Sequence, residues 1–187
     1  MKIYIKNMVC NRCIMAVNAI FTEMGYPPQS ILLGEVVVPR NIDPETLKTI
    51  DNKLHEIGFE IIEDNHKKII ERIKNIIIEM VHYSEEDQKL NYSAIIESKL
   101  NKSYNYLSNL FSSIEGTTIE HYIIHQKIEK AKELLVYDEL TLSEIAFKLG
   151  YSSVAHLSNQ FKKVTGLTPT HFKEIGETKR KAIDTVK

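Results

Sequence analysis

The sequence contains no apolar run near the roughly 18 to 20 residues that a helix needs to cross a bilayer. We expect no signal peptide either, because the polar, thiol-bearing segment 6–13 stands where its apolar stretch would lie. We therefore expect a cytoplasmic protein without a membrane partner. The 187 residues, 43% of them hydrophobic and 26% charged, suit one or two small globular domains.

Recognisable catalytic machinery is also lacking. No nucleophile–base pair and no glycine loop that could cradle a phosphate is visible in the sequence. An alkyl-transfer repair regulator would need a zinc-activated thiolate with more sulfur ligands than two cysteines provide. These absences indicate that the chain is not an enzyme.

Cysteine is scarce, and both cysteines, Cys10 and Cys13, lie in one C-x-x-C segment. In a cytosolic chain this pattern suggests a metal site or a redox pair rather than a structural disulfide. Two thiolates at this spacing can reach one ion, and soft sulfur ligands favour Cu(I) or Zn(II). The start of the following helix and the charge of Arg12 should lower the thiol pKa. Because two ligands do not complete a four-ligand zinc site, we favour Cu(I), which accepts low coordination.

A strong excess of one charge is absent as well, since the formal net charge is −1. The charge is nevertheless uneven: the first 91 residues carry −3 and the rest +2, with +5 in residues 148–187. A basic C-terminal end suits a DNA partner. A solvated lysine-rich tail explains it equally well, because Lys179, Arg180 and Lys181 supply three of its eight basic residues.

The first 62 residues have the pattern of a small α+β domain. Alternating and β-rich runs predict strands, whereas apolar residues at helical spacing, followed by glycine, predict helices. The expected elements are a strand at 2–6, a helix from Ile14 to Met24, strands at 31–33 and 36–38, a helix begun by Asp43 and Pro44, and a strand at 59–62. This β-α-β-β-α-β order is the split, ferredoxin-like arrangement.

A further helix is expected from about His66 to Tyr83, directly after a short linker. Its apolar residues recur at helical spacing. We interpret it as the first helix of the next domain. A coiled-coil dimer helix is the alternative, although fewer than three heptads support it; the seam would be Ile69, Ile73, Ile76, Met80 and Tyr83.

The rest of the chain contains an internal repeat with a period near 50 residues. Each copy has a short helix, a three-residue turn and a second helix ended by glycine, and one helix at about 120–137 joins the copies. The second helices share one spacing, found at Leu107, Phe111 and Gly116 and again at Leu157, Phe161 and Gly166. This is the helix-turn-helix plan, in which the second helix can enter the major groove of DNA.

Two sequence segments of the second copy resemble the signature of the DNA-binding domain of AraC/XylS transcription regulators. They are Ser143 to Tyr151 and Leu157 to Pro169. The segment from Lys127 to Leu135 resembles the linker helix of that family, and the whole resemblance covers residues 66–178. It implies seven helices, with two recognition helices entering successive major grooves. The implied partners are double-stranded DNA, a second copy of the chain and RNA polymerase.

Carried over by position, the resemblance assigns exposed, base-reading side chains to both recognition helices. They are Tyr104, Asn105, Ser108 and Asn109 in the first helix, and Ser153, Val154, Ala155, His156 and Asn159 in the second. Asparagine can pair with adenine, and valine or alanine can contact a thymine methyl group. Candidates for phosphate contacts, with a solvated surface as the equal alternative, are Lys102, Lys162 and Lys163.

Three features depart from the family pattern. Neither recognition helix carries arginine, the residue best suited to reading guanine. Ile96 stands where the second copy has Ala146, so we expect the first turn to pack differently. Lys127 stands where the family commonly has arginine. We expect these departures to affect DNA affinity and base preference rather than the fold.

Residues 1–64 resemble a heavy-metal-associated domain of the copper-chaperone type, which carries an M-x-C-x-x-C loop on a βαββαβ fold. The resemblance implies that Cys10 and Cys13 bind the metal, that Met8 anchors the loop in the core and that Phe59 lies near the metal. Arg12, between the cysteines, is unusual for the family. A redox dithiol and an interaction domain without metal remain the alternatives.

The sequence therefore predicts an α+β protein: a ferredoxin-like domain at 1–64, an all-α domain with two helix-turn-helix units at 66–178 and a basic tail at 179–187. We expect a sequence-specific DNA-binding transcription regulator that responds to a soft metal ion, with Cu(I) favoured over Zn(II) and Hg(II). In the alternative, the N-terminal domain serves dimerisation, partner binding or thiol redox sensing without metal.

Overall fold

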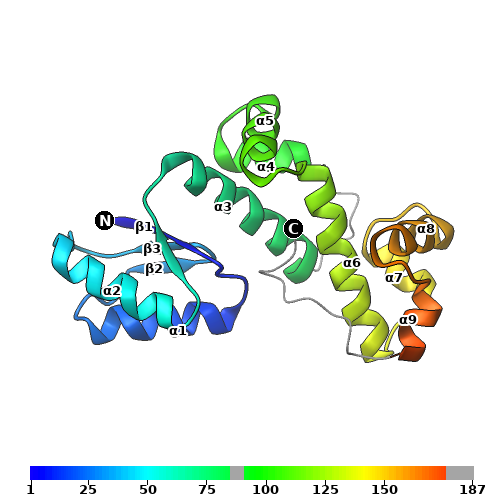
Figure 1. Cartoon of the computed structure of the whole chain (residues 1–187), viewed down its shortest axis with the longest axis horizontal. Coiled ribbons are helices and arrows are strands. Elements are labelled where there is room, and N and C mark those ends of the chain that lie inside the picture. Colours follow the sequence, from blue (N-terminus) through cyan, green and yellow to red (C-terminus); the bar gives the residue numbers. More distant parts are fainter. Residues whose placement is uncertain (85–90, 176–187) are drawn as a thin grey trace. The chain divides into compact units, whose positions relative to one another are not determined.

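The computed structural model describes residues 1–84 and 91–175, so the predicted basic tail at 179–187 lies outside the described residues. The chain divides into two compact units, Met1–Asn75 and Ile76–Lys187 (Figure 1). Each unit has its own hydrophobic core. None of the described helices combines the length and the apolar character that a membrane span requires.

The N-terminal unit has the predicted β-α-β-β-α-β order. Its elements are β1 (Lys2–Lys6), α1 (Asn11–Glu23), β2 (Ser30–Leu32), β3 (Glu35–Val37), α2 (Pro44–Glu56) and β4 (Glu60–Ile62). Neighbouring strands are antiparallel and follow the order β2-β3-β1-β4. The alternation predicted for β1 is confirmed: Ile3 and Ile5 are buried, whereas the flanking lysines are exposed.

Helices α1 and α2 cover one face of this sheet (Figure 1). Val17 and Phe21 of α1 and Ile50 and Leu54 of α2 are fully buried. Within each helix the two residues lie one turn apart, so each helix buries a single apolar stripe. Each of these side chains contributes about 1.5–3 kcal/mol of hydrophobic stabilisation.

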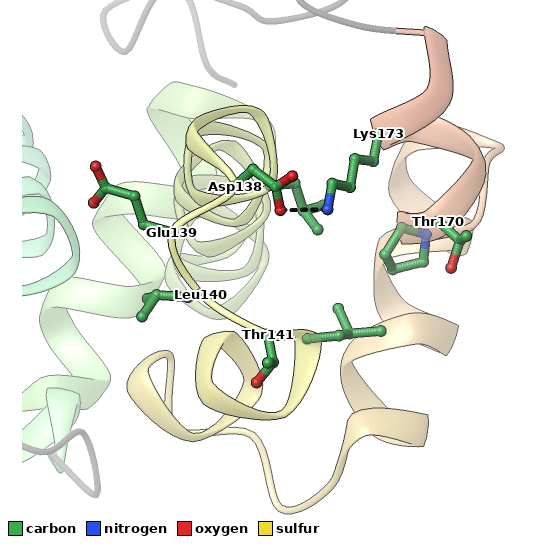
Figure 2. Close-up of a pocket in the computed structure, with 9 residues that line it drawn as sticks. Asp138, Glu139, Leu140, Thr141, Thr170 and Lys173 are labelled. Carbon is green, nitrogen blue, oxygen red and sulfur yellow. Dashed lines mark hydrogen bonds and ion pairs between the residues drawn. The ribbon is translucent and has the colours of Figure 1, made fainter.

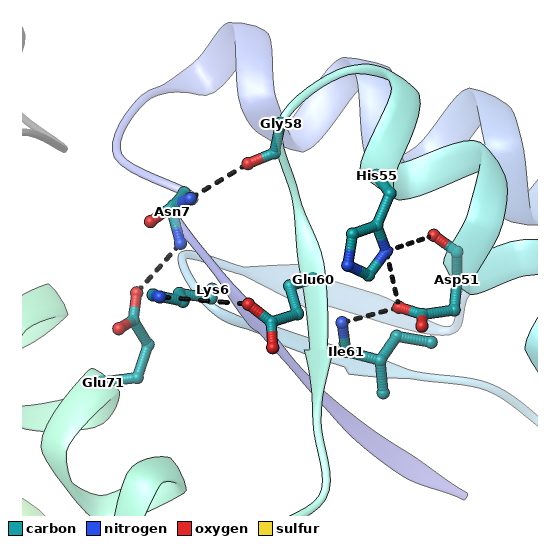
Figure 3. A network of polar contacts seen from close by, with 8 residues as sticks. All are labelled: Lys6, Asn7, Asp51, His55, Gly58, Glu60, Ile61 and Glu71. Carbon is teal, nitrogen blue, oxygen red and sulfur yellow. Dashed lines mark hydrogen bonds and ion pairs between the residues drawn. The ribbon is translucent and has the colours of Figure 1, made fainter.

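Polar contacts fix the short strand β4 at the edge of the sheet (Figure 3). The side-chain amide of Asn7 donates a hydrogen bond to the carbonyl of Gly58 at 2.9 Å. The carboxylate of Asp51 accepts one from the backbone N–H of Ile61, also at 2.9 Å. These bonds give hydrogen-bond partners to the carbonyl that precedes β4 and to an N–H group within it.

Helix α3 (Asn65–Ile78) belongs to both units, because the division falls after Asn75. Glu71 accepts a hydrogen bond from the backbone N–H of Asn7 at 3.0 Å, and Asn75 donates one to the carbonyl of Leu33 at 3.2 Å. The sequence had assigned this helix to the second domain. The structure places its first part with the sheet, since these two side chains bond to loops at the sheet ends.

The described part of the C-terminal unit is helical throughout. Its elements are the π-helical turn η1 (Glu79–Tyr83), α4 (Tyr92–Leu100), α5 (Tyr104–Glu115), α6 (Ile119–Tyr137), α7 (Leu142–Lys148), α8 (Val154–Thr165) and α9 (Pro169–Ile175). The two predicted helix-turn-helix units are α4 with α5 and α7 with α8. Figure 1 shows the first near one end of α6 and the second, with α9, near the other.

Both copies of the repeat use the same caps. A serine caps the second helix of each copy, a left-handed glycine ends it, and a threonine begins the next helix. The pairs are Ser103 and Ser153, Gly116 and Gly166, and Thr118 and Thr168. The two threonines accept hydrogen bonds from the backbone N–H of His121 and His171, so the matched histidine positions take part in capping.

Substitution of Gly34 by alanine should destabilise the N-terminal unit strongly. Gly34 has φ +75°, and a Cβ there would lie 2.0 Å from Nδ2 of Asn75. We expect a loss of about 2–4 kcal/mol in the free energy of unfolding, from backbone strain plus overpacking. Denaturant unfolding of the variant and the parent chain measures it.

Gly25→Ala is the matched control, because Gly25 has φ +80° with nothing within 4 Å of its Cβ position. It should cost only the strain, about 1–2 kcal/mol. Equal losses for the two variants would show that the contact between the β2–β3 turn and α3 is unimportant.

Candidate functional site

The second recognition helix, α8, is fixed to its domain by apolar residues. Leu157 and Phe161 are fully buried, and the Phe161 ring meets Phe172 of α9 edge-on, with centroids 5.4 Å apart. The preceding helix α7 begins with a capping box in which Thr141 and Glu144 exchange hydrogen bonds. These contacts position α8 so that its remaining side chains face outward.

Most of the side chains predicted to read bases on α8 are exposed. Ala155, His156 and Asn159 are exposed, as is the cap residue Ser153, whereas Val154 is half-buried against the core. The ring of His156 lies edge-on to Tyr151 with centroids 5.2 Å apart, and Nδ1 is 3.1 Å from the Ser152 hydroxyl. The His156 ring is therefore held in place before any ligand arrives.

The first recognition helix, α5, presents a similar but not identical surface. Asn105 and Asn109 are exposed, and Ser108 is half-buried. Tyr104 is half-buried and donates its hydroxyl to Glu120 at 2.5 Å; burial, followed by this bond, raises the pKa of Tyr104. Tyr104 is thus tied to the start of α6, unlike the asparagines beside it.

Tyr106 is an exposed aromatic residue that the sequence interpretation missed. Its side chain is 42% exposed and stands at the repeat position equivalent to His156. The 50-residue period could have identified it. Lys102 lies with Nζ 5.4 Å from the Tyr106 ring centroid, and the other two predicted phosphate-binding residues, Lys162 and Lys163, are exposed in the last turn of α8.

The two turns differ, as expected from Ile96. Ile96 and Ala146 are both buried, at 0% and 3% exposure. In the first turn the left-handed residue is Asn101, with φ 52°, whereas in the second it is Gly150, with φ 70°. By the repeat register, Asn101 lies one position later than Gly150. The larger isoleucine is therefore accompanied by a shifted turn.

The C-x-x-C segment lies at the start of α1, with Cys10 as the residue before the first helical turn. The two sulfur atoms are 3.3 Å apart, and both side chains are half-buried. Met8 is fully buried and Phe59 is 8% exposed in the same core. Arg12 is exposed beside the thiols.

The two thiols differ in acidity. Desolvation alone would raise the pKa of Cys10, but hydrogen bonds from Cys13 and from the backbone of Arg12, with the arginine charge, outweigh it and lower that pKa. Desolvation raises the pKa of Cys13. Among the described residues, no cluster of three or more histidine, cysteine, aspartate or glutamate side chains could hold a metal. The donor set is therefore two sulfur atoms, which suits a soft ion of low coordination number rather than a closed zinc site.

A pocket of about 370 Å³ lies where α6 ends, between α7 and α9 (Figure 2). Lys173 and Asp138 form an ion pair on its wall. Leu135, Leu140 and Pro169 contribute its apolar lining. None of the predicted DNA-binding residues lines this pocket, which is therefore separate from the candidate DNA-binding surface.

Known proteins resemble the C-terminal part of the chain. The family described as "Helix-turn-helix domain" matches residues 96–175. The C-terminal domain of AraT, a response regulator from Geobacillus stearothermophilus, is 28% identical, with a TM-score of 0.51, over 64% of this chain and 95% of that one.

Two curated relatives are regulators by name. "Uncharacterized HTH-type transcriptional regulator YtdP" of Bacillus subtilis is 28% identical over 68% of this chain and 17% of its own length. "Msm operon regulatory protein" of Streptococcus mutans is 26% identical over 70% of this chain and 46% of its own length. The chain thus spans less than half the length of these relatives. Their names agree with the expectation that the chain is not an enzyme.

The pKa difference predicts that Cys10 is alkylated before Cys13. The lower pKa gives Cys10 the larger thiolate fraction near neutral pH, and this gain exceeds the loss of intrinsic nucleophilicity. A short iodoacetamide pulse on the reduced chain, read by peptide mass spectrometry, measures the order. Arg12→Gln should narrow the difference. Faster labelling of Cys13 would contradict the assignment.

Proposed function

Because the C-terminal part of this chain belongs to the AraC type of helix-turn-helix DNA-binding domains, we propose that the chain is a sequence-specific transcription regulator. The observation that carries the proposal is the pair of helices α5 and α8. Each is anchored by a buried leucine and phenylalanine and exposes an asparagine at the matching repeat position, Asn109 and Asn159. Two such helices can read two segments of major groove.

The chemistry of the exposed residues favours A·T base pairs. No arginine occurs between residues 76 and 175, and the lysines of the recognition units lie in the turn or the last helical turn. Asparagine pairs with the N6 and N7 atoms of adenine, and the methyl group of Ala155 suits the thymine methyl. We infer that the target sites are rich in A·T pairs where α5 and α8 contact them.

We further propose that the N-terminal unit is a ferredoxin-like domain whose two thiols bind a soft metal ion, Cu(I) in preference to Zn(II) or Hg(II). The strand order and the 3.3 Å separation of the two sulfur atoms support this proposal. The ion would supply a charge and a sulfur–metal–sulfur link at the start of α1. Cys10 would hold it as the readier thiolate, and Cys13, packed against the core, would fix its place.

Two alternatives for the N-terminal unit remain open. In one it recruits a partner or a second copy of the chain without metal. In the other the two thiols form a disulfide and act as a redox sensor, a reaction that releases two protons and two electrons to an external oxidant. Metal titration and DNA binding separate these alternatives.

Replacement of Asn159 by alanine should weaken binding mainly at one A·T pair. The probe is the duplex that the full chain selects from a random library, which we expect to be A·T-rich. Loss of a bidentate contact should cost about 1–3 kcal/mol at that position and relax the preference there. Competition binding with single base-pair changes measures both effects.

Lys163→Ala is the matched control on the same helix. A lost phosphate contact should weaken binding evenly across sequences and reduce the salt slope by about one. Selection of G·C-rich duplexes, or an unchanged base preference in Asn159→Ala, would overturn the proposed A·T reading.

The metal proposal predicts that the reduced chain takes up one Cu(I) ion under anaerobic conditions. The double variant Cys10→Ser, Cys13→Ser should take up none, because hydroxyls are hard, weak ligands for Cu(I). Loading the parent chain should change its affinity for the selected duplex, and the double variant should show no such change. A metal-dependent change that survives in the double variant would rule out sensing by this site.

A further inference from the structure

Lys127, near the middle of α6, lies between two tyrosine rings. Its Nζ is 5.2 Å from the ring centroid of Tyr92 and 5.5 Å from that of Tyr151. Tyr92 is the first residue of α4, in the first helix-turn-helix unit, and Tyr151 lies in the turn between α7 and α8 of the second. One side chain of the connecting helix therefore touches both DNA-reading units.

The surroundings of this ammonium group are unusual for a lysine. Burial lowers the pKa of Lys127, raises the pKa of Tyr92 to about 12 and also raises the pKa of Tyr151, so both rings stay neutral. No ion pair of Lys127 is found among the described residues, and the buried hydroxyl of Tyr151 has no hydrogen-bond partner there. The Lys127 ammonium group therefore interacts with the faces of the Tyr92 and Tyr151 rings. Such a cation–π interaction is stronger where water is excluded.

The other lysines of α6 are satisfied locally. Lys130 pairs with Glu133 at 2.9 Å, and Lys132 pairs with Glu129 at 2.6 Å. Both carboxylate partners lie on α6 itself, one turn away, and Nζ of Lys132 also lies 5.9 Å from the ring centroid of Phe172 in α9. Of the three, Lys127 alone is held by residues from the two helix-turn-helix units, so its contacts connect those units instead of stabilising a single helix.

We propose that Lys127 is a positioning residue that fixes the distance and angle between the two recognition helices by joining Tyr92 to Tyr151. The proposal rests on the DNA binding proposed above. Two half-sites on one face of DNA lie about 34–36 Å apart, and each added base pair turns one site by about 34° relative to the other. A protein whose recognition helices are held at a fixed separation should therefore lose DNA affinity when the spacing between the half-sites changes. A protein whose recognition helices can move relative to each other should lose less.

The test uses the full chain and the duplex that it selects from a random library. Derivatives of this duplex carry one or two base pairs inserted between the halves read by α5 and α8. The parent chain should lose at least about tenfold in affinity for the longer spacing, because only one recognition helix then fits. Lys127→Met keeps an unbranched chain of nearly the same length and removes the charge. The variant should bind the original duplex about tenfold more weakly, which is the loss expected of a desolvated cation–π contact. Its affinity should then fall little more when base pairs are inserted between the two halves.

Three variants control for stability and charge. Lys127→Arg keeps a cation between the rings and should restore the strict spacing. Lys130→Met removes a lysine of α6 that contacts neither ring, and should leave the spacing dependence unchanged. If Lys127→Met does not fold, Tyr92→Leu, which removes one ring face, should show the same tolerance.

The outcomes separate this proposal from the proposed function. If the folded Lys127→Met or Tyr92→Leu chain keeps the spacing dependence of the parent, the positioning role is wrong while DNA binding stands. The same conclusion follows if Lys130→Met gives equal tolerance. If the parent chain selects no duplex at all, the proposed function fails, and this inference with it.

Discussion

One helix, α6, must serve two hydrophobic cores, and the whole C-terminal unit depends on this constraint. Near its start, Tyr122 meets Phe111 of α5, with ring centroids 5.7 Å apart. Further along, Ile128, Ala131 and Leu135 belong to the core of the second helix-turn-helix unit. A helix that is buried on several sides leaves little of its surface to water. The polar residues on those sides must therefore find partners inside the protein.

The polar residues of α6 meet this requirement in different ways. Lys132 and Glu129 form an ion pair, and both side chains are 7% exposed. Oε1 of Gln126 lies 2.9 Å from Nε2 of His82. Burial lowers the pKa of His82, which favours the neutral ring in this contact. A buried pair adds little stability compared with apolar residues of the same size, but loss of one partner leaves the other uncompensated. Lys127 has no ion-pair partner on α6. Its ammonium group lies instead against the aromatic rings of Tyr92 and Tyr151.

The features predicted correctly from the sequence are those that depend on short segments. Asp43 caps α2 by accepting a hydrogen bond from Thr46, three residues on, and the repeat fixed the positions of α5 and α8. The bond from Tyr104 to Glu120 spans 16 residues, and the sharing of α3 between two units depends on contacts across more than 40. Apolar periodicity indicates which face of a helix is buried but does not identify the partner of a polar side chain. Tertiary contacts of polar groups therefore had to come from the structure.

Because arginine is scarce in the C-terminal unit, the specificity of DNA binding should depend more on how the two recognition helices are placed relative to each other. Lysine contacts to phosphates raise affinity for every sequence alike, and they weaken as salt rises. Exposed asparagine and apolar side chains, the kinds of residue that can distinguish bases, are few on each recognition helix. When each helix alone discriminates weakly, useful specificity requires that both bind together, and this gain exists only if their separation matches the DNA. A stiff connecting helix with both units held on it meets this condition, whereas a flexible linker would lose much of the gain to conformational entropy.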